Sequence, residues 1–221
     1  MIISPQRQST ASPRHRAIPA TFPSDLCNSP YGGSLRFVPA VRPRGFQPLD
    51  VVESIFAEHQ HEIARAVGRN GTVVDLAVDD DCAAAPWLVE SLQPRQYVAV
   101  RPTVQAVKHS VQALRLRYRQ LEALAHEADF VQPFELPQQV HWGQRLFVCG
   151  AFVAELAPEA IRRFVAGLRR QCRDDGGVMI GVDRLRHRIE TFKALLCCAG
   201  FGEITAWGDD EHGFTVLLAR V

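Results

Sequence analysis

Several features that mark common protein classes are missing from this 221-residue sequence. No apolar run approaches the roughly 18 residues of a transmembrane helix, so we expect no membrane span. No two cysteines have CxxC spacing, and no histidines are spaced as metal ligands, so we expect no zinc site and no other metal. The G-x-S-x-G, P-loop and HExxH motifs are also missing, which argues against the enzyme classes that they mark.

Positively and negatively charged residues are nearly equal in number. Lysine is scarce, since only Lys108 and Lys193 occur among the 25 Lys and Arg residues, and the net charge is +1. Nothing in this balance would steer the chain toward nucleic acid or a membrane surface. We therefore expect neither as a partner.

The six cysteines mostly lie in apolar segments. Cys149 falls in an expected strand, and Cys197 and Cys198 fall in an expected helix. This pattern is typical of buried thiols in a reducing compartment, which predicts a cytoplasmic protein.

The first 48 residues differ in composition from the rest. They contain eight of the 14 prolines and six arginines, but Asp25 is their only acid. We expect residues 1–24 to be a disordered tail, because proline breaks helices and the segment offers little to bury. Residues 25–48 are predicted to form an arm on one domain that covers residues 25–221.

Strand and helix patterns then alternate along the chain. A helix is expected from Asp50, which forms a capping box with Glu53. Further helices are expected over 82–92, 104–126, 158–172 and 188–199. Strands are expected over 72–77, 96–100, 128–131, 145–152, 178–183, 203–207 and 214–221, with a loop over 132–144.

This alternation predicts the fold class. Repeated strand–helix units indicate a mostly parallel α/β sheet with helices on both faces. The tight turn between the last two strands indicates an antiparallel hairpin at the end of the chain. The layout is that of a Rossmann-type, class I methyltransferase-like fold.

Scattered segments then point to one family. The similar segments are Gly33-Ser34-Leu35-Arg36-Phe37 and Gly181-Val182-Asp183, together with 73–76, 97–100, 129–130, 150–160 and 199–201. Together they resemble the histidine-specific SAM-dependent methyltransferases, typified by the L-histidine Nα-methyltransferase of ergothioneine synthesis. The resemblance implies S-adenosyl-L-methionine (SAM) as cofactor and a small amine or amino acid as methyl acceptor. It implies a cofactor site made of Asp75, Ala77, Asp79, Arg101, Asp129, Phe130 and Gly150.

The sequence also departs from the family pattern. Where the family has Gly-x-Gly after its first strand, this chain has Ala77-Val78-Asp79, whose side chains would crowd a cofactor that approaches the backbone. The acid that ends the second strand and binds the ribose hydroxyls is replaced by Arg101, which can only donate. Only residues 184–198 stand where the family carries much of its substrate lobe.

Three acidic residues have alternative roles. Glu155 replaces a substrate-binding asparagine of the family, and it is either a catalytic base or an exposed loop residue. Asp183 ends a strand, and it either lies at the ligand or caps the next helix. Asp129 would hold the adenine amino group or would be a surface or capping residue.

Two functions follow from these observations, and the sequence leaves open whether the chain is an enzyme. The first is an active SAM-dependent methyltransferase with an altered pocket, in which Glu155 and Asp183 are the catalytic candidates. The second is a catalytically degenerate methyltransferase-like domain that binds a protein partner or acts as a scaffold. A variant of the second is a site completed by another chain.

Overall fold

A mixed seven-stranded sheet forms the centre of the molecule. The computed structural model describes residues 48–77, 85–129, 132–150, 152–153, 156–172, 174–183, 189–209 and 213–221. The sheet order is β3-β2-β1-β4-β5-β7-β6, in which β1 to β5 are parallel and β7 is antiparallel to β5 and β6. This arrangement confirms the predicted sheet and its C-terminal hairpin. The strands are β1 (Thr72–Leu76), β2 (Gln96–Arg101), β3 (Glu122–Glu127), β4 (Arg145–Cys149), β5 (Gly177–Asp183), β6 (Glu203–Asp209) and β7 (Phe214–Arg220).

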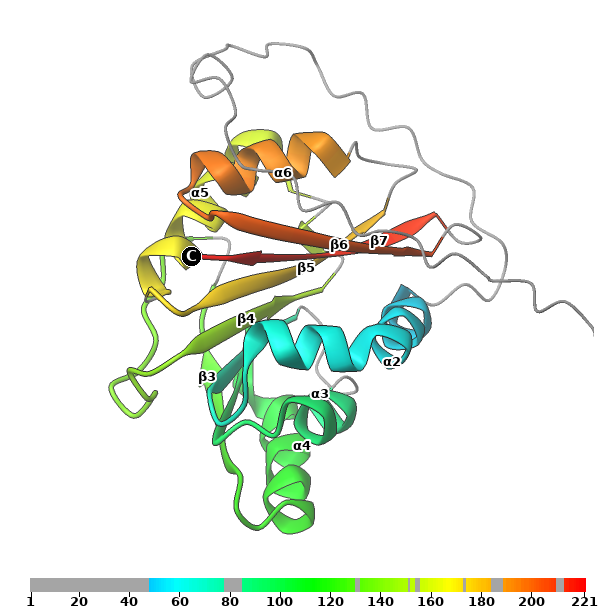
Figure 1. The fold of residues 1–221 in the computed structure, drawn as a ribbon. Helices are drawn as coiled ribbons and strands as arrows, with labels where there is room; N and C mark the ends of the chain where they lie inside the picture. The colour runs from blue at the N-terminus through cyan, green and yellow to red at the C-terminus, as the bar shows by residue number, and fades with distance from the viewer. Residues whose placement is uncertain are drawn as a thin grey trace, which may run out of the picture.

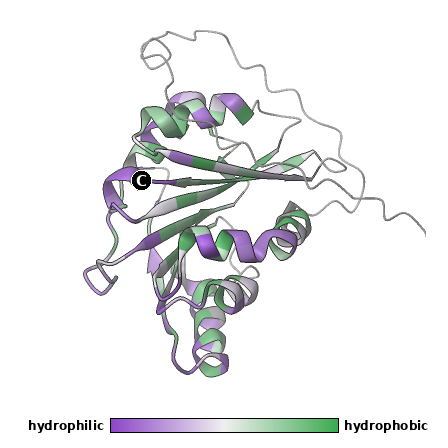
Figure 2. Cartoon of the chain, in the orientation of Figure 1, coloured by the Kyte–Doolittle hydropathy of each residue, from purple (hydrophilic) through white to green (hydrophobic). Residues whose placement is uncertain are grey.

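Helices cover both faces of the sheet (Figure 1). One face, called here the α2 face, is covered by α2 (Pro48–Val67), α3 (Ala85–Leu92) and α4 (Val104–Arg117). The other, called the α5 face, is covered by α5 (Pro158–Gln171) and α6 (Ile189–Cys198). Figure 2 shows that hydrophobic residues are frequent in the central strands, whereas the helices mix hydrophobic and hydrophilic residues. Each face therefore has its own hydrophobic core.

The predicted tail and most of the predicted arm lie outside the described residues. The helix expected from Asp50 begins two residues earlier, at Pro48, because proline is well tolerated in the first turn of a helix. Its buried side chains include Ile55, Phe56 and Ile63. Trp207 of β6 donates an indole N–H to Glu62 Oε2 at 2.9 Å, which ties α2 to the hairpin.

The third strand is where the prediction was wrong. The helix expected over 104–126 ends at Arg117, and the strand expected from Ala128 begins at Glu122. The segment Glu-Ala-Leu-Ala-His-Glu consists largely of helix-forming residues, but pairing with β2 at Tyr97↔Ala123 and Val98↔Leu124 overrides that preference.

The connection from β3 to β4 has no regular structure over residues 132–144, as predicted. Two glutamine side chains fix it by binding its backbone. Gln96 donates to Gln139 O and accepts from His141 N, both at 2.9 Å. Gln171 of α5 donates to Phe134 O at 3.0 Å and accepts from Leu136 N at 3.2 Å. The connection is thus held at both ends by side-chain amides.

Replacing Gln96 by alanine is expected to lower the free energy of unfolding by about 1.5 kcal/mol, because it leaves two backbone groups without partners. Urea denaturation monitored by circular dichroism measures the loss. Gln120→Ala, at an exposed turn position, is the matched control and should change stability by less than about 0.5 kcal/mol. Equal losses in the two variants would contradict the role given to Gln96.

The cysteines differ among themselves. Cys149 and Cys172 are buried free thiols, as expected; burial raises the pKa of Cys149 well above its usual value and that of Cys172 to about 12. Cys197 is a half-buried free thiol. Cys198, however, is disulfide-bonded, which contradicts the expectation of free thiols throughout.

No helix in the described part of the chain has the length and apolar character needed to cross a bilayer.

Candidate functional site

The parallel strands bring most of the predicted site residues to one edge of the sheet. Ala77 follows β1, Arg101 ends β2, Asp129 follows β3, Gly150 follows β4 and Asp183 ends β5. Backbone hydrogen bonds from Ala128 N to Arg101 O at 3.0 Å and from Gly150 N to Leu76 O at 3.3 Å join neighbouring ends. These residues therefore lie at the carboxyl edge of the sheet, which is where open α/β sheets bind ligands.

Three of the predicted residues lie outside the described part of the chain: Asp79, Phe130 and Glu155. Asp183 is described by its backbone, which pairs with Phe214 as the last residue of β5. The roles assigned to these four side chains stay predictions.

The Arg101 side chain is buried on the α2 face of the sheet. Only 1% of the residue is exposed. Its Nη2 donates to Asp75 Oδ2 at 2.7 Å, and its Nη1 donates to the carbonyl oxygens of Asp75 at 2.8 Å and of Val100 at 2.9 Å. These bonds tie the guanidinium to β1.

Asp75 completes a buried cluster with Arg101 and Tyr97. The Asp75 residue is 5% exposed, and its Oδ2 also accepts a hydrogen bond of 2.6 Å from the Tyr97 hydroxyl. Burial raises the pKa of Cys149 on the neighbouring strand, and the negative charge of Asp75 raises that pKa further. Removing two charges from water is costly, so such a pair persists only when hydrogen bonds satisfy both partners, as they do here.

The alternation of side chains along the strands explains this cluster. Val73 and Asp75 point to the α2 face from β1, and Tyr97, Ala99 and Arg101 point to it from β2. The register Asp75↔Ala99 then places Tyr97 and Arg101 on either side of the Asp75 carboxylate. Sequence reasoning missed Tyr97, although the two-residue period of both strands was a signal that could have found it.

The other residues at the edge are more open. Ala77 is half-buried and its backbone does not enter the left-handed region, so its φ does not itself require glycine. Gly150 is exposed, and a Cβ added there would come no closer than 3.8 Å to the Phe152 ring. Asp129 is also exposed. These positions leave space, but they supply few buried polar groups that could bind a ligand.

Two cavities formed by described residues lie away from this edge. One depression runs beside α5, and a smaller one lies at the opposite edge of the sheet, near Gly68 and Gly71. Neither is lined by Ala77, Arg101 or Gly150. Within the same residues, no three His, Cys, Asp or Glu side chains are grouped as metal ligands.

Solved structures with this fold are methyltransferases in most cases. An S-adenosylmethionine-dependent methyltransferase from Clostridium acetobutylicum is 6% identical with a TM-score of 0.57, over 80% of this chain and 93% of that one. Human N-acetylserotonin methyltransferase in complex with SAM is 13% identical with a TM-score of 0.52, over 78% of this chain and 54% of that one, so the chain spans about half of that enzyme. These likenesses confirm the class I methyltransferase fold.

A third structure covers more of this chain. It is described as a possible exported protein from Bordetella parapertussis, and it is 11% identical with a TM-score of 0.60, over 93% of this chain and 80% of that one. No curated protein matches the sequence significantly. A family model described as histidine-specific methyltransferase, SAM-dependent, matches residues 31–191, which is most of the chain. The chain therefore belongs to the family of histidine-specific, SAM-dependent methyltransferases.

Proposed function

We propose that this chain is a non-catalytic member of its family, which binds a partner and does not transfer a methyl group from SAM. The observation that carries the proposal is the buried ion pair between Arg101 and Asp75. It occupies the position at which the resemblance predicts an acid for the cofactor ribose.

The end of β2 also lacks the group that the family is expected to use to bind SAM. The ribose hydroxyls need an acceptor at the end of β2, and an arginine has none. Nη1 and Nη2 of Arg101 donate to Asp75 and Val100, so these donors satisfy groups of the protein itself. The described residues therefore do not fit the family's way of holding the cofactor, and we derive no methyl-transfer step through them.

The shortened substrate lobe is a second support. Between β5 and β6, the described residues form one helix, α6, and it packs Phe192 and Leu196 into the core of the α5 face. A helix used in this way closes the sheet and contributes no separate lobe. The described residues between β5 and β6 therefore offer no separate lobe that could bind an acceptor such as histidine.

The second candidate is an active methyltransferase with an altered pocket, acting on a small amine or amino acid. Family membership and the open positions of Asp129 and Gly150 at the edge favour it. In that case Glu155 and Asp183 would be the residues to test as bases, since both are predicted near the same edge.

Isothermal titration of the full chain with SAM and with S-adenosylhomocysteine separates the two candidates. We expect no binding heat up to about 1 mM of either ligand, since the ribose acceptor is missing. A circular dichroism melt of the same sample controls for folding. Saturable binding in the micromolar range would overturn the proposal and favour the enzyme, and a screen of amine acceptors would follow.

A further inference from the structure

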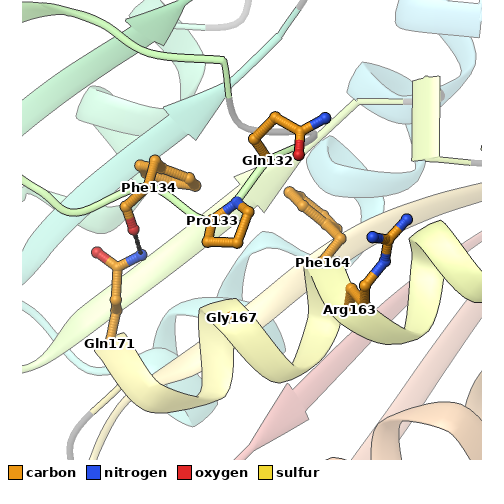
Figure 3. A pocket seen from close by; sticks show the side chains of 7 residues that line it. All are labelled: Gln132, Pro133, Phe134, Arg163, Phe164, Gly167 and Gln171. Atoms are coloured by element: carbon orange, nitrogen blue, oxygen red, sulfur yellow. Dashed lines mark hydrogen bonds between the residues drawn. The ribbon is translucent and has the colours of Figure 1, made fainter.

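A shallow groove runs along α5 on the side that faces the β3–β4 connection (Figure 3). Pro133 and Phe134 of the connection line one wall, and Arg163, Phe164 and Gly167 of α5 line the other. The Phe164 ring is 4% exposed and is braced by an edge contact with Phe152, with ring centroids 5.8 Å apart. The floor of the groove is therefore apolar and well packed.

The wall opposite α5 is held in place. Gln171, at the end of α5, binds the backbone of the connection at Phe134 and at Leu136, and Figure 3 shows the first of these bonds. Because the connection and the helix are joined by this amide, binding in the groove would not require the wall to become ordered. Such preorganisation lowers the cost of binding.

Two arginines lie beside this floor, and neither forms an ion pair with another described residue. Arg163, Gly167 and Arg170 are spaced i, i+4 and i+7, so they form one stripe on α5. Arg163 and Arg170 are exposed, and neither makes an ion pair or a side-chain hydrogen bond within the described residues. Arg170 Nη2 lies 3.8 Å from the position that a Gly167 Cβ would take, so its guanidinium lies over the gap that the glycine leaves.

The neighbouring arginines of α5 are engaged. Arg162 pairs with Glu159 at 3.4 Å, and Arg169 donates to Gly200 O at 2.9 Å at the end of α6. The unpaired charges are thus confined to the side of the helix that borders the groove.

We infer that this groove, lined by Pro133, Phe134, Arg163, Phe164 and Gly167 and bordered by Arg170, binds an acidic segment of a partner protein. Carboxylates of the segment pair with the Arg163 and Arg170 guanidiniums, whose planar forks match a carboxylate. One apolar side chain of the segment covers Phe164 in the gap at Gly167. The inference concerns the α5 face and not the strand edge, so it holds whether or not SAM binds.

Charge identifies this occupant among the alternatives. Residues 1–47 contain six arginines and one acid, so the chain's own N-terminal segment would be repelled. A second copy related by a two-fold axis through the groove would bring the same arginines face to face. Nucleic acid binding depends on several phosphate contacts, whereas this groove offers two free guanidiniums and an apolar floor.

A labelled peptide tests the inference. The probe is fluorescein-labelled Glu-Glu-Leu-Phe-Glu-Glu, titrated with the full chain in about 50 mM salt and followed by fluorescence anisotropy. We expect saturable binding, at least tenfold weaker binding for R163E/R170E, and weaker binding for Gly167→Leu, which fills the gap without changing charge. R69E/R119E reverses two exposed arginines elsewhere and should bind within about twofold of the unaltered chain.

Three results would overturn the inference. The first is no saturable binding of the peptide at about 1 mM protein. The second is an equal loss in R163E/R170E and R69E/R119E, which would mean that only the overall charge matters. The third is tighter binding of a fluorescein-labelled oligothymidylate than of the peptide, with the same sensitivity to R163E/R170E, which would assign the groove to nucleic acid. SAM titration is independent of all three, so the outcome does not depend on the proposed function.

Discussion

Replacing Gly177 by alanine is expected to lower the free energy of unfolding by about 3 kcal/mol. A Cβ at Gly177 would lie 2.8 Å from the carbonyl oxygen of Ala219 on β7, well inside contact distance. Since that oxygen belongs to the backbone of a paired strand, it cannot move aside as a flexible side chain would. Either β5 or β7 must shift, and the join between the parallel strands and the C-terminal hairpin is weakened.

Urea denaturation of Gly177→Ala and Gly202→Ala measures this effect against a matched control. A Cβ at Gly202 would meet nothing within 4 Å, so that variant should differ from the unaltered chain by less than about 0.5 kcal/mol. Similar losses in both variants would show that the cost comes from losing glycine as such and not from the contact with β7.

The hairpin was predictable because its signals are local. Gly208 and Gly213 flank a short turn between two apolar segments. An antiparallel hairpin can be predicted from such a local pattern without information from the rest of the chain. β3 was not predictable in the same way, since Glu122–Glu127 favours a helix by composition. Its strand conformation comes from pairing with β2 at the edge of the sheet, which involves residues more than 20 positions earlier.

The candidate site shows the same division. The family resemblance predicts that Ala77, Arg101, Asp129 and Gly150 share one cofactor site, and the folded chain places all four at the carboxyl edge of the sheet. The sequence does not predict where the Arg101 side chain points. That direction depends on the register between β1 and β2, which places Asp75 within reach of the guanidinium. The register is a tertiary property, so the ion pair becomes evident only in the folded molecule.

The Arg101–Asp75 pair is expected to make the largest single contribution to stability among the changes considered. Arg101→Met should lower the free energy of unfolding by about 3–5 kcal/mol, because it leaves the buried Asp75 carboxylate without its cation. The double variant D75N/R101M should lose less than R101M alone, since neither charge is then left unpaired. Urea denaturation of the single and double variants measures the coupling, and Arg119→Met is the exposed control.

The same variants distinguish a structural from a ligand-binding role for Arg101. A ligand that binds only the folded chain raises its melting temperature, and the shift grows with the logarithm of the ligand concentration divided by its Kd. If Arg101 is purely structural, S-adenosylhomocysteine will shift the melting temperatures of the unaltered chain and of D75N/R101M equally or not at all, while their stabilities still differ. A shift in the unaltered chain that disappears in D75N/R101M, but remains in Arg119→Met, would mean that the pair supports cofactor binding. The chain would then hold its cofactor through a guanidinium where its family is expected to use a carboxylate, and the non-catalytic proposal would be wrong.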